Sequence, residues 1–266
     1  VGAAVRYYPP PTTPFCERQS IDKAFDDGDY VVSDANVLLH IPFNDSLMPK
    51  IARGDGAPVR KPDEPQYVEG ARGNAVVLEG YKSLVYHEAD QFDRQSGAIE
   101  MWHKPLSWDG SYARQHKFTT VTASRTVDYK PALYWHIANT HSTPTNLFGT
   151  GGVQVEYPPQ QWRHLLLTWS GRHCKLYVDG QCVGYGLSPQ GLLPPGEEFE
   201  PGKIALPGTR KTAVDDYTVY GRPLSPREAK NHYLRYTAPE KMQPPGDVAI
   251  FTVDYPGEEK LLCELF

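Results

Sequence analysis

Residues 162–185 read WRHLLLTWSGRHCKLYVDGQCVGY, and they carry the strongest strand and turn signals of the chain. Trp162–Trp169 is apolar through its middle and predicts one strong strand. Cys174–Val178 and Gln181–Tyr185 predict two more strands, separated only by the dipeptide Asp179-Gly180. That dipeptide is typical of a type I′ turn, because both central positions of the turn require positive φ. The stretch therefore predicts a β-hairpin within an antiparallel sheet.

Short segments of alternating or β-branched residues recur on both sides of this hairpin. We expect further strands at Val37–Phe43, Ala75–Leu78, Leu84–Tyr86, Gly97–His103, Phe118–Ala123, Leu133–Ile137, Gln154–Tyr157, Val214–Tyr220, Val248–Val253 and Lys260–Leu265. The segment Met48–Asn74 is rich in Pro, Gly and charge, and we expect a long loop there. Short strands separated by turn residues indicate an all-β fold, a two-sheet antiparallel jelly-roll sandwich.

One or two short helices accompany these strands. Ser20 could cap a first helix over Ser20–Asp29. A second is expected from Pro226 to about Tyr233, because Ser225 stands at the N-cap and Glu228 three residues later. This spacing forms a capping box, and proline suits the first helical position.

Length and charge limit the class of protein. The chain has 266 residues, 39% of them hydrophobic, and a formal net charge of −5. That is enough to build one sizeable core, and mildly negative charge disfavours a nucleic-acid partner. No apolar run is long enough to span a bilayer. The sequence starts Val1-Gly2 without a readable targeting signal, so we expect a processed or excised chain.

The four cysteines do not suggest a metal ribbon, because none forms a CxxC pair. In the predicted hairpin Cys182 faces Tyr177 and Cys174 faces Tyr185, so the two thiols fall on opposite faces and cannot form a disulfide. Cys16 and Cys263 lie near the two ends, where a bridge would close the termini. Buried free thiols are the preferred interpretation.

Several segments occur in an order that resembles the laminin-G-like, concanavalin A-like jelly-roll domains. The segments are Phe43-Asn44-Asp45, Gly70–Leu78, Ile99–Pro105, Trp162–Trp169, Leu176–Gly180 and Val214–Ser225. The resemblance implies an N-terminal extension at 1–34, the jelly-roll domain at 35–237, and strands or a linker to a following domain at 238–266.

The resemblance also implies a role. Such domains are usually secreted or at the cell surface and bind glycans or proteins, so we expect a non-catalytic, lectin-like module that binds a polysaccharide or glycan, beside neighbouring domains of a larger chain. A jelly-roll polysaccharide lyase or glycoside hydrolase is the alternative, and a protein-protein adhesion module is the second. The motifs G-x-S-x-G and H-E-x-x-H are absent, which disfavours catalysis.

Many members of that family hold one calcium ion at the edge of the sandwich, and the resemblance places it at Asn44, Asp45 and Asp215. Calcium prefers carboxylate, amide and main-chain oxygens. Asp215 is preferred over Asp216, because successive strand residues point to opposite faces. The alternative is that Asn44-Asp45 forms a plain turn and Asp215 accepts hydrogen bonds from nearby amides.

Aromatic and hydrogen-bonding residues suggest where a sugar would bind. In the strand at 133–137, alternation places Tyr134 and His136 on the face opposite Trp135. The loop expected at 106–117 adds ligand candidates, because functional residues concentrate on loops. The loop candidates are Trp108, Tyr112, Arg114 and His116. Each of these residues could equally have a structural role.

Overall fold

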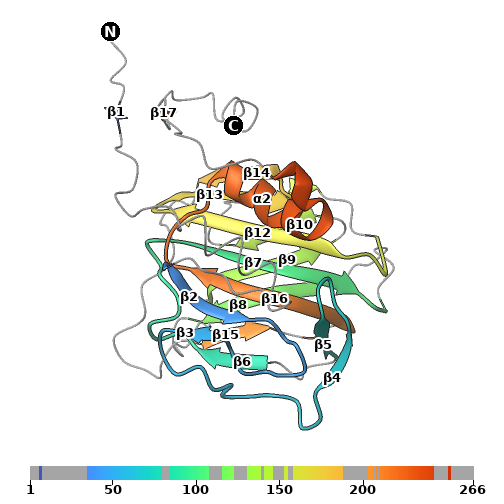
Figure 1. The fold of residues 1–266 in the computed structure, drawn as a ribbon. Helices are drawn as coiled ribbons and strands as arrows, with labels where there is room; N and C mark the ends of the chain where they lie inside the picture. Colours follow the sequence, from blue (N-terminus) through green and yellow to red (C-terminus); the bar gives the residue numbers. More distant parts are fainter. Residues whose placement is uncertain are drawn as a thin grey trace.

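The computed structural model describes residues 6–7, 35–79, 84–107, 116–122, 131–138, 141–145, 153–154, 158–187, 203–206, 208, 210–242 and 251–252. Among these residues every strand pairing is antiparallel. The strands form two large sheets that lie against each other (Figure 1), which confirms the predicted all-β sandwich.

The larger sheet has nine strands within the described ranges. Its order is β14 (Gln181–Leu187), β13 (His173–Val178), β12 (Arg163–Ser170), β7 (Ser96–Pro105), β16 (Thr212–Tyr220), β2 (Val37–Ile41) and β3 (Ile51–Ala52). In addition, β5 (Asn74–Leu78) pairs with the first half of β16, and β4 (Gln66–Glu69) pairs with β5.

The second sheet has six described strands. Their order is β11 (Val153–Gln154), β10 (His141–Thr145), β9 (Pro131–Ala138), β8 (His116–Thr122), β15 (Lys203–Leu206) and β6 (Leu84–His87). Separately, β1 (Arg6–Tyr7) pairs with β17 (Phe251–Thr252).

The main core lies between the two sheets. Trp135 from β9, Leu167 from β12 and Tyr217 from β16 are all fully buried in it. Removing a large apolar side chain of this kind from water stabilises the fold by about 1.5 to 3 kcal/mol. This layer therefore supplies much of the driving force for stacking the sheets.

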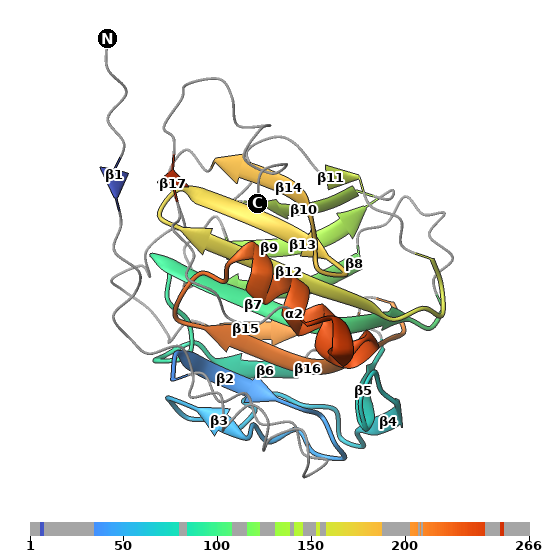
Figure 2. The same cartoon turned by 45° about the horizontal axis from the view of Figure 1, so that its top comes forward.

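A second, smaller core covers the outer face of the larger sheet. The helix α2 (Pro226–Thr237), followed by the short 3-10 helix η1 (Pro239–Lys241), lies across this face (Figure 2). Leu166, Tyr220 and Ala229 are fully or almost fully buried between sheet and helix. The middle strands of the larger sheet are thus covered on both sides.

The hairpin confirms the predicted placement of two cysteines. Cys174 belongs to the main core and Cys182 packs against the outer core, and both are free thiols. Tyr177 lies opposite Cys182 as predicted, but a β-bulge next to Tyr177 shifts the register, so Cys174 lies opposite Gly186 instead of Tyr185. The bulge adds one residue to one strand, and sequence alternation alone does not reveal it.

The capping box of α2 is present in both halves. The Ser225 hydroxyl accepts from the Glu228 backbone N–H at 3.2 Å, and the Glu228 carboxylate accepts from the Ser225 N–H at 2.8 Å. The helix ends at Thr237, about one turn later than predicted.

Some expectations were wrong or fall outside the described residues. The segment 48–74 is not only loop, since it contains β3 and β4; both are short, and proline and glycine around them hide the strand pattern. The strands β10 and β15 were not predicted. The first helix (20–29), Cys16, Cys263 and the strand at 260–265 lie outside the described part.

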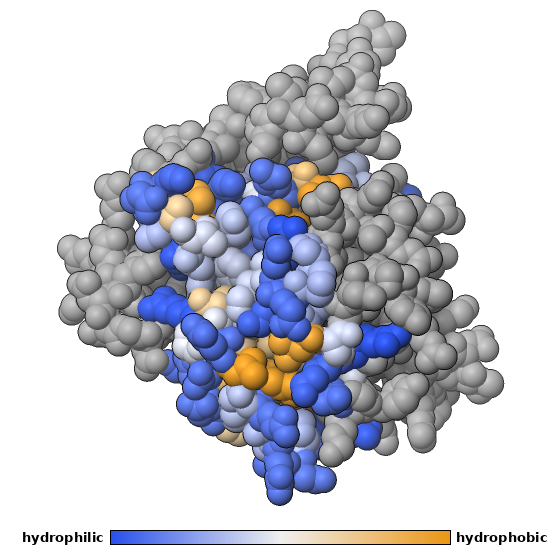
Figure 3. All heavy atoms as spheres, turned by 90° about the vertical axis from the view of Figure 1, so that its right-hand side faces the viewer, coloured by the Kyte–Doolittle hydropathy of each residue, from blue (hydrophilic) through white to orange (hydrophobic). Residues whose placement is uncertain are grey.

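The coloured part of the surface in Figure 3 is mostly hydrophilic, with a hydrophobic area in its lower part and smaller ones near its top. Across the described residues, Met48 and Val59 are the large hydrophobic side chains classed as exposed, at 53% and 47%. Scattered exposed apolar residues of this kind are ordinary for a folded surface. No helix in the described ranges is long and apolar enough to cross a membrane.

Candidate functional site

The predicted metal residues meet at one tight turn between β4 and β5. Asn44 follows Phe43, whose backbone is left-handed (φ 56°) and whose ring is fully buried. The Asn44 Oδ1 accepts from the Asn74 backbone N–H at 2.8 Å, and both carboxylate oxygens of Asp45 accept from the Asn74 side-chain amide at 2.9 Å. The end of β2 is thereby attached to the turn at residues 70–74.

Asp215 contacts the same turn from β16. Its Oδ2 accepts from the Arg72 backbone N–H at 3.1 Å, and a Cβ at Gly70 would lie only 2.4 Å from this oxygen. A Cβ at Gly73 would likewise lie 2.2 Å from Asn44 Oδ1, and the Gly70 N–H donates to the Gly73 carbonyl at 2.8 Å. Both glycines are required here because Asn44 and Asp215 press against the turn.

The turn brings together two side-chain oxygens of the kind that calcium prefers, one from Asn44 and one from Asp215. Asp215 is fully buried, and its Oδ1 has no hydrogen-bond partner among the described residues. Burial raises the pKa of Asp215, and the adjacent carboxylate of Asp216 raises it further. A cation beside Oδ1 would compensate the buried charge, and Asn44 Oδ1 would add a second oxygen of the kind calcium prefers. No cluster of three or more His, Cys, Asp or Glu with metal-binding geometry occurs in the described part of the chain.

Asp216 belongs to a different environment. A bulge in β16 and a left-handed backbone at Asp216 (φ 47°) turn it away from the partners of Asp215. Its Oδ2 accepts from the hydroxyl of Tyr236 on α2 at 2.5 Å. The two adjacent aspartates therefore bind different elements, one the 70–74 turn and the other the helix.

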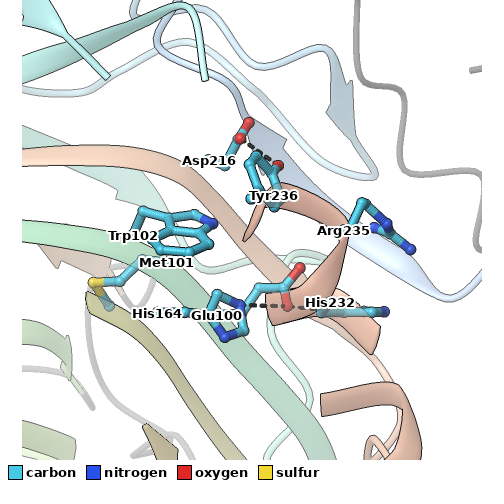
Figure 4. Close-up of a pocket in the computed structure, with 8 residues that line it drawn as sticks. All are labelled: Glu100, Met101, Trp102, His164, Asp216, His232, Arg235 and Tyr236. Carbon is cyan, nitrogen blue, oxygen red and sulfur yellow. Dashed lines mark hydrogen bonds and ion pairs between the residues drawn. The ribbon is translucent and has the colours of Figure 1, made fainter. Parts of the chain in front are cut away.

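A buried acid-base cluster lies between the larger sheet and α2 (Figure 4). Glu100 of β7 accepts from the Tyr220 hydroxyl at 2.6 Å through Oε1, and its Oε2 lies 2.7 Å from His232 Nδ1 and 3.4 Å from His164 Nε2. The cluster lines a cavity of about 10 Å³. The lining residues are Glu100, Met101, Trp102, His164, Asp216, His232, Arg235 and Tyr236.

Opposed effects set the protonation of this cluster. Burial alone would raise the pKa of Glu100, but His232 and His164 outweigh it and hold that pKa well below its usual range. Burial would lower the pKa of His232, but the Glu100 carboxylate outweighs it and raises that pKa. The result is a charged pair that holds α2 against β7.

The cluster cannot admit a substrate. Its volume is near the space that one water molecule requires. Trp102 Nε1 and His164 Nδ1 are buried beside it without a hydrogen-bond partner among the described residues, and a single water would suit them. We interpret the cluster as part of the packing of α2. The sequence did not predict this cluster, because His232 lies 132 residues from Glu100. The feature that could have indicated it is a glutamate placed between the core positions Ile99 and Met101.

The predicted sugar-binding residues are only partly within the described structure. Trp108, Tyr112 and Arg114 lie outside it. His116 lies on β8, and Tyr134 and His136 lie on the adjacent strand β9, where β8 residue Lys117 pairs with His136. Trp135, on the face that alternation places opposite Tyr134 and His136, is fully buried in the main core. The side chains of His116, Tyr134 and His136 are outside the described part, so their role stays a prediction.

Comparisons with solved structures agree with this architecture. The binding domain of Paraclostridial Mosquitocidal Protein 1 matches with 14% identity and a TM-score of 0.55, over 76% of this chain and 52% of that one. Trypanosoma rangeli sialidase matches with 11% identity and a TM-score of 0.58, over 83% of this chain and 38% of the sialidase. The chain thus spans about half or less of these two proteins, and at such identities the similarity shows the fold alone.

A third structure is covered almost completely. Domain 4 of AbnA, a GH43 extracellular arabinanase from Geobacillus stearothermophilus solved with arabinotriose, matches over 97% of its length and 74% of this chain, with 17% identity and a TM-score of 0.51. No curated protein sequence matches the chain.

The family profile Laminin_G_3 matches residues 79–230, more than half of the 266 residues. This range includes the hairpin, β16 and the start of α2. The chain therefore belongs to this family of the concanavalin A-like lectin/glucanases superfamily.

Proposed function

We propose that the chain is a non-catalytic carbohydrate-binding module of a secreted or cell-surface protein. The observation that carries the proposal is the match to nearly the whole of the arabinanase domain whose structure was solved with arabinotriose. The match covers nearly the whole of that domain, so the two chains share the fold of an entire domain and not of a fragment. A fold alone does not determine function, and binding must be tested directly.

The acid-base cluster does not have the geometry of a catalytic site for a glycan. A catalytic carboxylate must lie within hydrogen-bond distance of the substrate, directly or through one water. Glu100 is 6% exposed, and the cavity beside it has space for about one water molecule. Its partners hold α2 in place, which is a structural task.

The test combines a binding and a turnover measurement on the same full chain. Binding to a glycan array or by calorimetry, with no product after prolonged incubation, supports the proposal. Release of reducing sugar would assign a hydrolase, and a rise in ultraviolet absorbance from an unsaturated uronate would assign a lyase. Failure on broad glycan panels together with one tight protein partner would replace the proposal with an adhesion module.

We also propose that Asn44 and Asp215, beside the turn at 70–74, bind a structural calcium ion. Asp45, the third residue predicted for this site, is left out because both its carboxylate oxygens accept from the Asn74 side-chain amide. At a calcium concentration about 100 times Kd, binding stabilises the folded state by about 2.7 kcal/mol. For a domain of this size the Tm should rise by about 5 to 10 °C over the value in chelator. Asp215→Asn should abolish this rise, whereas Asp63→Asn, at an exposed aspartate, should retain it. An unchanged wild-type Tm would contradict the calcium site.

A further inference from the structure

A second concave region lies on the described surface, at the end of the sandwich where β2 begins and β16 has ended. It is an open groove of about 760 Å³, lined by the chain around Asn36, by Arg53, and by the loop between β6 and β7. It lies at the opposite end of β2 from Asn44 and is distinct from the calcium candidate. The region is shallow and mostly open to solvent, which suits a ligand that lies along the surface over one that is enclosed.

The loop that forms one wall is held rigidly by its own buried side chains. Arg94 donates to both oxygens of Glu88, at 2.7 and 2.6 Å, and both residues are less than one-tenth exposed. Gln91 is fully buried and donates to the backbone carbonyls of His87 at 2.8 Å and Asp55 at 3.0 Å. Such a bidentate ion pair with a buried amide fixes the backbone before any ligand arrives.

Trp169 of the larger sheet also holds this loop in place. The Trp169 indole N–H donates to the Asp93 carbonyl at 3.1 Å, and the Phe92 ring packs against Trp169 with centroids 5.1 Å apart. Asp93 uses its Oδ1 to accept from the Gln95 backbone N–H at 2.7 Å. Preorganisation of this kind lowers the entropic cost of binding.

The groove presents planar polar side chains that differ in how far they are exposed. Asp90 and Gln95 are exposed, whereas Asn36 and Asp93 are half-buried, and Phe92 contributes an apolar floor. Carboxylate and amide groups each offer two neighbouring hydrogen-bonding atoms, which suits a pair of adjacent hydroxyls on a sugar ring. A few polar groups around an apolar surface are typical of a site that orients a small ligand.

The charge of the lining selects between neutral and acidic sugars. Two cations, Arg53 and Arg94, stand against three anions, Glu88, Asp90 and Asp93, and Arg94 is already paired with Glu88. Arg53 donates to the backbone carbonyls of residues 35 and 37. Approaching Asp90 and Asp93 would cost a sugar carboxylate electrostatic energy. The lining thus favours an uncharged sugar.

We propose that this groove is the glycan-binding site and that its ligand is an uncharged oligosaccharide, hydrogen-bonded by Asp90 and Asn36. This inference rests on the proposed carbohydrate-binding function. It assigns binding to the end of the sandwich, away from Tyr134 and His136 on β9.

The experiment measures binding of arabinotriose, xylotriose and cellotriose as neutral probes and sialyllactose as an acidic one, by calorimetry on the full chain. We expect at least one neutral probe to bind, and Asp90→Ala and Asn36→Ala each to weaken that binding about tenfold or more. Asp63→Ala, at another exposed aspartate, is the matched control and should bind as wild type. Circular dichroism melts of each variant verify that the fold is retained.

The outcomes separate the two proposals. If the groove variants bind like wild type while Tyr134→Ala abolishes binding, the groove is wrong and the carbohydrate-binding function stands. Binding of sialyllactose with none of the neutral probes would overturn the assigned ligand class. If the wild type binds no probe here and no sugar on a broad glycan array, the function and the groove fail together.

Discussion

At the scale of single residues, the turn at 70–74 shows how a side chain distant in sequence, Asn44, constrains a glycine. Gly73 has φ +67°, and a Cβ there would lie 2.2 Å from Asn44 Oδ1, whereas Gly171 has φ +57° with nothing within 4 Å. Gly171→Ala should therefore cost only the left-handed strain of about 1 to 2 kcal/mol. Gly73→Ala should cost measurably more in the free energy of urea unfolding, and Asn44→Ala in the same chain should remove the excess. Equal costs at the two glycines would contradict the steric argument.

Glu100 forms the buried ion pair between the sheet and α2, through His232. Glu100→Gln keeps the shape but leaves His232 and His164 without their carboxylate partner. Breaking a buried ion pair in this way typically destabilises a protein by about 3 to 5 kcal/mol. Urea unfolding should show this loss, while the exposed Glu64→Gln should change stability by less than about 0.5 kcal/mol. A fully stable Glu100→Gln variant would show that the pair contributes nothing net.

At this scale the sequence named three residues that the structure brings together, and their role as metal ligands stays a prediction. Asn44, Asp45 and Asp215 were identified, and the structure brings them to one turn. The Glu100 cluster was not predicted, because its members come from β7, β12, β16 and α2 and meet only after the helix docks. The loop that forms the groove was not predicted either. In the sequence, Glu88 and Arg94 look like ordinary exposed charges, and their burial as a pair is apparent only in the structure.

At the scale of elements, the attachment of α2 should depend on pH. His232 has a pKa raised above 6.5, so its contribution is complete below pH 6.5 and is lost as the pH rises through the folded-state value. Glu100 has a pKa depressed below 4.5, so its contribution is present above pH 4.5 and is lost as the pH falls through the folded-state value. The pair therefore stabilises α2 most between these two limits.

The measurement is the difference in urea midpoint between wild type and His232→Gln across pH 4 to 9. Asp215 and Asp216 also have raised pKa values and titrate in both proteins, so the difference reports on the His232–Glu100 pair, in which each residue shifts the pKa of the other. Other groups around His232 are Glu228, which raises its pKa, and Arg222, which lowers it. We expect the difference to be largest between pH 4.5 and 6.5 and to decline in alkali. A difference that is constant with pH would exclude the ion pair as the cause.

Elements with a strong local pattern were predictable, and those defined by their partners were not. The hairpin, β7, β12 and β16 have alternating or apolar patterns, and the capping box of α2 is readable from four residues. The strand β10 contains Pro144 and little apolar alternation, and β3 has only two residues. Such strands exist because a neighbouring strand offers hydrogen bonds, which is tertiary information.

At the scale of the whole molecule, adjacent leucines test whether the larger sheet is buried on both faces. Leu167 lies in the core between the sheets and Leu166 in the core under α2, and both are fully buried. A sandwich with an open outer face would tolerate Leu166→Ala at almost no cost. Here each of Leu166→Ala and Leu167→Ala should cost about 2 to 5 kcal/mol, because each leaves a cavity in a packed layer.

The helix, both sheets and both cores should also unfold together. Urea unfolding followed by tryptophan fluorescence and by far-ultraviolet circular dichroism should give one coincident transition for wild type and both variants. The volume-conserving changes Leu166→Met and Leu167→Met serve as controls and should cost less than about 1.5 kcal/mol. If Leu166→Ala is silent or produces a separate early transition, α2 is an independent attachment. In that case the sandwich stands without it, and the Glu100 cluster would stabilise only the helix.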